Sequence, residues 1–229
     1  MDALAWAARN NHAAIVMLLL AHGSKINRED DPNRNALRYA VSSGNLSMTR
    51  LLLTAGAIVP TGCPRNSELT VFCSAITAGL TGWQPVRSRH DNSTRFYRNR
   101  APPHDKISVE EFDKRVQDRA DLGRLLLEHG ATIEDSFPGH LRGYEYAIHC
   151  NAAPVLEIYL DRGAVAIDQV NFQGMTPLLL AVRRNAHAVA RMLVSRGADF
   201  LKPDYEGKTP LEYAQDDAMI GILYAGVGV

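Results

Sequence analysis

The chain has 229 residues, of which 46% are hydrophobic and 22% are charged, and its formal net charge at pH 7 is zero. This composition is typical of soluble globular proteins and excludes an intrinsically disordered chain. The balanced charge argues against electrostatic attraction of the whole molecule to nucleic acid or to an anionic membrane.

The cysteine content and the hydropathy of the chain indicate the cellular compartment in which we expect the protein. Cys63, Cys73 and Cys150 are too few and too irregularly spaced for a disulfide framework, which favours a reducing environment. The apolar run Ile15–Ala21 is seven residues long, far below the roughly 18 residues of a membrane span. No basic segment precedes it, so we expect no signal peptide. The sequence therefore predicts a cytoplasmic, intracellular protein without a membrane association.

Regularly spaced glycines close a series of apolar helical segments along the chain. The spacings between them are 33, 74, 33 and 34 residues, and the glycines are Gly23, Gly56, Gly130, Gly163 and Gly197. Apolar pairs such as Leu19-Leu20 precede each glycine, with another pair four residues earlier, which places them on one helical face. A glycine after such a helix is typical of a left-handed C-cap. The longest interval, from Gly56 to Gly130, contains one 33-residue period and about 41 extra residues.

The most regular stretch is Asn171–Lys202, whose opening returns 33 residues later. The residues that recur are Gly174, Thr176, Pro177, Leu178 and Ala181, which return as Gly207, Thr209, Pro210, Leu211 and Ala214. Thr176 and Thr209 are predicted N-caps, with proline at the first helical position, where no N–H is needed. A 33-residue period with a T-P-L start and an R-G-A-D ending resembles the ankyrin repeat.

The resemblance implies an all-α solenoid of five to six helix-turn-helix repeats, each with a projecting β-hairpin loop. One repeat cannot bury its apolar face alone, so the array shares one continuous core. We predict a single array over residues 1–229, with repeats at about 1–29, 30–62, 63–135, 136–170, 171–203 and a partial repeat at 204–229. No repeat has the family histidine after the leucine, and Leu179 and Glu212 stand there instead.

The third repeat contains the insertion, at about residues 80–118. Its first part, Trp83–Lys106, has a net charge of +4 and no clear period, which predicts a loop. Ser108 to Glu111 matches a capping box, so the second helix is expected to start near Ser108. Long loops inside compact arrays are usually functional or disordered.

His149 and Cys150 form the most suggestive chemical pair. The resemblance places them at the end of the first helix of the fourth repeat, on the concave ligand surface. A cysteine nucleophile needs a base within hydrogen-bond reach, and adjacent residues of a helix do not face each other. We therefore expect a structural thiol beside a contact histidine. Under an alternative hypothesis the insertion is a lid over a small-molecule or catalytic site that includes Tyr144, Tyr146, His149, Cys150, Arg183 and Arg184.

Other catalytic and metal motifs are missing from the sequence. Glu206 to Thr209 ends like a phosphate-binding loop, but Lys202 replaces the required glycine. The eight histidines are scattered and no C-x-x-C or H-E-x-x-H occurs. We predict no metal and no cofactor, and the sequence favours a non-enzymatic protein.

The function that the sequence favours is recognition of a protein partner in the concave groove, at the hairpin tips and at the ends of the first helices. A charge gradient from Arg183-Arg184 to Asp216-Asp217 would orient the partner. Nucleic-acid association through the basic insertion is a weaker third hypothesis. The candidate contact residues are Trp83, Arg95, Arg98, His149, Phe172, Gln173, Met175, Arg183, Arg184, Tyr205, Glu206, Lys208, Asp216 and Asp217.

Overall fold

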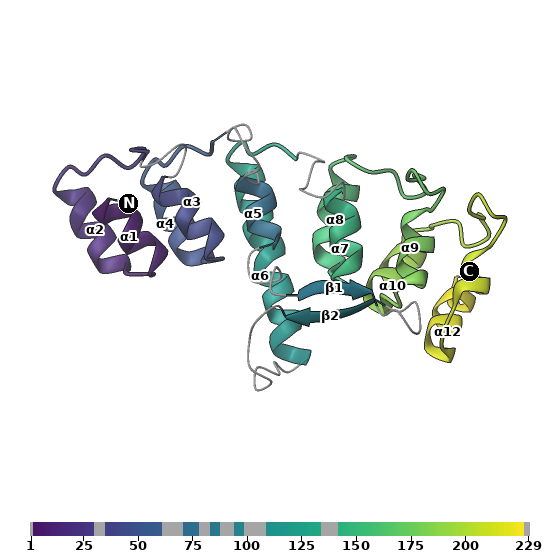
Figure 1. The fold of residues 1–229 in the computed structure, drawn as a ribbon. Helices are drawn as coiled ribbons and strands as arrows, with labels where there is room; N and C mark the ends of the chain where they lie inside the picture. The colour runs from purple at the N-terminus through teal and green to yellow at the C-terminus, as the bar shows by residue number, and fades with distance from the viewer. Residues whose placement is uncertain are drawn as a thin grey trace. The chain divides into compact units, whose positions relative to one another are not determined.

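The computed structural model describes residues 2–29, 35–60, 71–77, 83–87, 94–98, 109–133 and 142–226. Helices follow one another in pairs within these ranges (Figure 1). The pairs are α1 (Ala3–Arg9) and α2 (Ala13–Ala21), α3 (Ala36–Ser42) and α4 (Leu46–Thr54), α5 (Val71–Thr77) and α6 (Val109–Glu128), α7 (Gly143–His149) and α8 (Ala153–Asp161), α9 (Pro177–Arg183) and α10 (His187–Ser195), and α11 (Pro210–Tyr213) and α12 (Asp217–Ala225). The predicted fold of paired helices is confirmed. In the part of the chain that the structure describes, no helix has the length and apolar character of a membrane span.

The insertion contains two short strands where the sequence predicted an irregular loop. Strand β1 (Trp83–Arg87) pairs antiparallel with β2 (Thr94–Arg98), with Trp83 opposite Arg98 and Val86 opposite Arg95. Backbone pairing explains the difference, because a two-stranded hairpin satisfies its hydrogen bonds internally without a long hydrophobic period. Outside this hairpin, the loop residues that the structure describes form turns and no paired strands.

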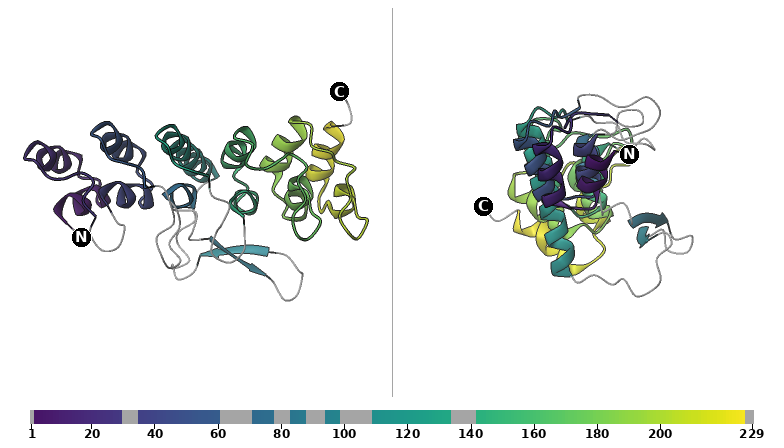
Figure 2. Two further views of the ribbon diagram at one scale, coloured as in Figure 1. Left: turned by 90° about the horizontal axis from the view of Figure 1, so that it is seen from above. Right: turned by 90° about the vertical axis from the view of Figure 1, so that its left-hand side faces the viewer.

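The chain forms two compact units. The first consists of Met1–Thr81 and Pro102–Gly139, and the second of Gly82–Ala101 and His140–Val229. In the first unit, α1 packs on α3, α3 on α5, and α4 on α6. In the second, α7 and α8 pack on α9 and α10, which in turn pack on α11 and α12. Figure 2 shows the two helices of each pair lying alongside one another. The repeat boundaries given above remain predictions.

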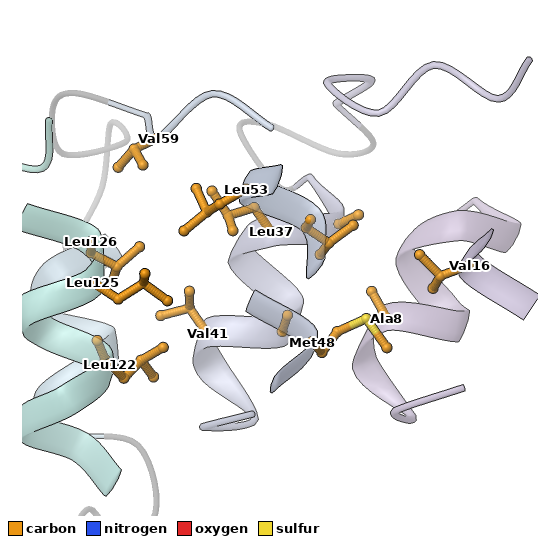
Figure 3. Packing of buried hydrophobic residues seen from close by; sticks show 14 of the residues in the cluster. Ala8, Val16, Leu37, Val41, Met48, Leu53, Val59, Leu122, Leu125 and Leu126 are labelled. Atoms are coloured by element: carbon orange, nitrogen blue, oxygen red, sulfur yellow. The ribbon is translucent and has the colours of Figure 1, made fainter. Parts of the chain in front are cut away.

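Small residues allow close packing in the first unit. Ala8, Ala40 and Ala75 lie in the first helices of their pairs and are fully buried. Figure 3 shows Val41 pointing toward the leucines of α6, and Met48 pointing toward Ala8. One apolar cluster therefore joins α1 to α6, and no single pair encloses it.

Left-handed residues reverse the chain within and after four of the helix pairs, α1/α2, α3/α4, α7/α8 and α9/α10, and a left-handed glycine also follows α6. The turn after a first helix passes through Asn11, Gly44, Asn151 or Asn185, with φ of 60°, 69°, 52° and 56°. The predicted closing glycines all have positive φ, from 67° at Gly163 to 93° at Gly56. The predicted left-handed C-caps are thus confirmed.

The predicted N-caps form without the family histidine. The Thr176 Oγ1 accepts from the Leu179 N–H at 3.1 Å, and the Thr209 N–H donates to the Glu212 carboxylate at 2.6 Å. Helix α11 ends at Tyr213 because Ala214 is extended, with ψ of 127°. Asp216 therefore caps α12, and the prediction that Asp216 and Asp217 end the first helix of the last repeat is wrong.

Replacement of Gly197 by valine tests the left-handed caps. Gly197 has φ of +82°, and a Cβ there would meet nothing within 4 Å, so the cost is that of the backbone alone. We expect Gly197→Val to lower the free energy of unfolding by more than about 1 kcal/mol, measured by chemical denaturation. Gly221 lies inside α12 and a Cβ there is also free of contacts. Gly221→Ala should stabilise by roughly 0.5–1 kcal/mol, and equal effects at both positions would contradict the cap assignment.

Candidate binding surface of the second unit

Two loop tips of the second unit share one conformation. The Asn171 Oδ1 accepts from the N–H groups of Gln173 and Met175, at 2.9 and 3.0 Å. Thirty-three residues later, the Asp204 Oδ1 accepts from Glu206 and Lys208 at the same two distances. A side-chain oxygen that accepts from residues two and four positions on closes the turn locally. The tips are therefore ordered without strand pairing.

Both tips are anchored to the helices beneath them. The Asn171 amide donates to the buried Glu145 carboxylate at 2.9 Å, and that carboxylate accepts from the Arg142 N–H at 3.0 Å. The Tyr213 hydroxyl donates to the Asp204 carboxylate at 2.6 Å. This hydrogen bond is the main reason that the pKa of Asp204 is lowered. The tips are held by buried or partly buried polar groups, which limits their movement.

An aromatic side chain projects from each tip. Phe172 is 74% exposed and Tyr205 is 75% exposed, at equivalent positions of the two turns. The Tyr205 ring covers Gly174, where a Cβ would lie 2.4 Å from the Tyr205 Cγ. Gly174 therefore serves two purposes, because it adopts a φ of +76° and leaves room for the ring of the next tip. Gln173, Glu206 and Lys208 are exposed beside these rings, whereas Met175 is buried.

The arginine pair at the end of α9 lies on the same unit. Arg183 is exposed, and its Nη1 lies 3.4 Å from the Met175 Sδ, so the guanidinium lies back along α9 toward the tip. Arg184 is half-buried at the C-cap of α9. Positive charge at a helix C-terminus is favourable there. The structure thus joins Arg183 to the tip through Met175.

Asp216 does not present a free carboxylate. Its oxygens accept from the Met219 N–H at 2.7 Å, the Asn185 amide at 2.9 Å and the His187 Nε2 at 3.1 Å. These bonds, with that from Asn185 the largest, lower the pKa of Asp216 to about 2. Asp216 connects the turn after α9 to the start of α12, while Asp217 is exposed. The negative end of the predicted charge gradient is therefore reduced to Asp217.

His149 and Cys150 are buried, and each is 7% exposed. Burial and, to a smaller extent, the charge of Arg184 lower the pKa of His149 to about 4. Burial raises the pKa of Cys150 to about 12, although a hydrogen bond with Tyr146 acts in the opposite direction. Burial is also the main cause of the raised pKa of Tyr146. At neutral pH the thiol is protonated, which is the opposite of what a nucleophile requires.

The cavities that the structure describes lie elsewhere. One of about 550 Å³ is lined by residues around Gly163 and Arg196, and one of about 460 Å³ in the first unit by residues around Asp2 and Gly23. Neither is lined by His149, Cys150, Tyr144 or Tyr146. Within the described ranges, no group of three or more His, Cys, Asp or Glu side chains could hold a metal ion. Trp83, Arg95 and Arg98 lie in the hairpin strands, and their side chains are outside the described part.

Sequence reasoning missed the polar connections between neighbouring repeats. Besides the Asn171 and Asp216 networks, the Asn151 Oδ1 accepts from the Val189 N–H at 3.2 Å. The signal was present in the sequence, because asparagine occupies the same turn position before α8, at Asn151, and before α10, at Asn185. An asparagine that tolerates positive φ and can also hydrogen-bond fits that turn.

Comparison with known proteins agrees with the helix pairs and their turns. The family model described as ankyrin repeats (3 copies) matches residues 1–61 and 144–225, which is more than half of the chain. The chain belongs to the ankyrin repeat family. No curated protein matches the sequence. The predicted resemblance is thus confirmed by the family model as well as by the fold.

Several solved ankyrin structures have a similar fold. An ankyrin repeat domain from Acinetobacter baumannii matches with a TM-score of 0.60 and 19% identity, over 98% of this chain and 97% of its own. The human ASB11 ankyrin repeat domain matches with a TM-score of 0.54 and 20% identity, over 100% and 99%. A Bdellovibrio bacteriovorus structure, the Bd0816 predatory endopeptidase in complex with immunity protein Bd3460, matches with a TM-score of 0.57 and 19% identity, over 98% of each chain. At these identities the likeness shows the fold alone.

The buried imidazole predicts a pH dependence of stability. The pKa of His149 is about 4 in the folded chain and near 6.5 in the unfolded chain, so the unfolded state binds the proton more readily between these values. Stability should therefore decrease as the pH falls from 6.5 to 4, by up to about 3 kcal/mol. Urea denaturation of the wild type and His149→Phe at pH 7 and pH 4 checks this. His149→Phe should show a smaller decrease, and His22→Phe, at an exposed position, should keep the full decrease.

The buried thiol predicts slow chemical modification. Because Cys150 is protonated and 7% exposed, we expect labelling by a thiol reagent at neutral pH to be slower than that of an accessible thiol by on the order of 100-fold. Peptide mapping by mass spectrometry would follow Cys150 with and without concentrated urea. Rapid labelling of the folded chain would show that the thiol is accessible and ionised.

Proposed function

We propose that the chain is a protein-recognition module that binds its partner mainly through the second unit. The observation that carries this proposal is the pair of exposed, equivalent aromatic side chains, Phe172 and Tyr205, on hydrogen-bonded tips. Aromatic residues on rigid supports contribute large contact areas at a small entropic cost. Exposed apolar side chains of this size on neighbouring turns are typical of interaction sites.

The charged side chains near the tips would select the partner. Arg183 is exposed and lies against a thioether, and Arg184 follows it. Gln173, Glu206 and Lys208 add polar groups beside the two rings. Asp217 and the buried His149 lie at the other end of the helices, next to the turns, and we include them as further contacts. We infer that the partner carries an acidic group for Arg183 and an apolar group for the two aromatic rings. The backbones of Trp83, Arg95 and Arg98 belong to the same unit, and we include these residues as further contacts.

The structural relatives support a role in protein binding. One of them was solved as a complex of an endopeptidase with an immunity protein. We propose an intracellular location for this role, in agreement with the reduced cysteines Cys73 and Cys150. The two described cavities lend no support to the alternative of an enzyme or a small-molecule site at His149 and Cys150, because neither is lined by this pair.

Charge reversal at the end of α9 tests the proposed surface. The partner would be isolated by cross-linking and affinity capture, purified, and titrated by calorimetry. We expect the double variant Arg183→Glu, Arg184→Glu to abolish binding, and Phe172→Ala or Tyr205→Ala to raise Kd by at least about 30-fold. Circular dichroism and the denaturation midpoint would confirm that the array remains folded.

Arg191→Glu is the matched control, because Arg191 is an exposed arginine of the same unit that lies on α10, the second helix of its pair. It should retain wild-type affinity. Unchanged affinity in the double variant would exclude the Arg183 surface, and a loss of affinity in Arg191→Glu alone would assign binding to the second helices.

A further inference from the structure

Arg119 is a buried cation in the middle of α6. It is 8% exposed, and its Nε and Nη1 have no hydrogen-bond partner among the residues that the structure describes. Burial lowers the pKa of Arg119, the Asp118 carboxylate opposes this effect, and the charge of Arg115 adds to it. Buried guanidinium groups normally have their donors satisfied, because an unpaired buried charge is costly. Arg119 therefore needs an acceptor that these residues do not supply.

The guanidinium lies against the turn between α3 and α4. A Cβ on Gly44 would fall 1.3 Å from the Arg119 Nη1 and 1.9 Å from its Cζ, so the group occupies the volume of the missing side chain. At the equivalent turns of the second unit this volume holds the side chains of Asn151 and Asn185, which bond to the start of the next repeat's second helix. Gly44 makes room for a cation where other repeats have a neutral amide.

The difference follows from the length of α6. Helices α10 and α12 start beside these turns and have free N–H groups there, which the asparagines and Asp216 help to satisfy. Helix α6 starts at Val109, ten residues before Arg119. The backbone N–H groups near Arg119 are therefore inside the helix and need no capping partner. Arg119 is therefore not required to cap α6, and its Nε and Nη1 donors remain without a partner among the described residues.

A second positive group lies next to Arg119. Gly44 directly precedes Asn45, the N-cap of α4, whose side chain accepts from the Met48 N–H at 3.0 Å. The N–H groups of Leu46 and Ser47 belong to the first turn, where the helix has a partial positive charge. Ser47 is exposed and adds a hydroxyl donor. The turn thus brings together two sources of positive potential, both of which favour an anion.

We propose that Arg119 and the first turn of α4 form a binding site for an oxyanion, a carboxylate or a phosphate. The anion accepts hydrogen bonds from the guanidinium and from the N–H groups of Leu46 and Ser47. Arginine is well suited to both anions, since its N–H groups match their oxygen atoms. The site lies in the first unit and does not depend on the partner surface of the second unit.

Nuclear magnetic resonance with two simple probes tests the site. Inorganic phosphate and acetate would be titrated separately into the labelled full chain at constant ionic strength, so that general screening does not change. We expect saturable shifts of the Arg119 Nε–Hε signal and of the Leu46 and Ser47 amides, with a Kd of about 1 mM or lower. The probe that binds more tightly identifies the preferred anion.

Arg119→Met should abolish the shifts at Leu46 and Ser47, and Arg119→Lys should weaken them, because lysine keeps the charge and loses the planar donors. Arg50→Met, at an exposed position of α4, is the control and should bind like the wild type. If Arg119→Met does not fold, the lysine variant decides the result. No saturable shift with either probe, or equal loss in Arg50→Met, would overturn the proposal.

Discussion

Chain reversal through left-handed residues is the constraint on which the other features depend. Four of the helix pairs have a reversal between their helices, at Asn11, Gly44, Asn151 and Asn185, and a second reversal after them at a glycine. Left-handed φ is costly for most residues, so these positions admit few residue types and fix the length of each helix. Because the reversals recur with the repeat, small buried residues recur at equivalent places of the first helices, such as Ala40 in the first unit and Ala181 in the second, and the pairs within a unit pack on one another.

Hydrogen bonds between repeats add to this apolar packing in the second unit. Asn151 bonds to the N–H of Val189, and Asn185 bonds to Asp216, both at the turn end of the helices. At the tip end, Asn171 bonds to Glu145 of the preceding pair. Each neighbouring pair of repeats is thus connected at a second point besides its core, which keeps polar groups satisfied where the backbone turns. The Asn171 bond also anchors the tip from which Phe172 projects.

The period predicted the helix pairs, their glycine caps and the caps at Thr176 and Thr209, because these depend on neighbouring residues within one repeat. The period did not predict contacts between residues at positions that are not equivalent in the repeats. Asp216 was assigned to a helix end, since nothing local shows that Ala214 is extended. The proximity of Arg119 and Gly44 has no counterpart in other repeats, because it depends on the extension of α6. The β1–β2 hairpin could not be predicted from the period either, because it lies in the insertion and not in the repeating pattern.

The use of Asp216 as a cap also changes the electrostatic character of the proposed partner surface. With that carboxylate engaged by Asn185 and His187, Asp217 at the start of α12 is the exposed acidic residue left from the predicted gradient opposite Arg183. This surface would then orient a partner of mixed charge less strongly than the predicted gradient of positive and negative charge. It would favour an acidic partner through Arg183. Since rim charges act mainly on association rates, the aromatic tips would supply most of the binding energy and Arg183 most of the selectivity.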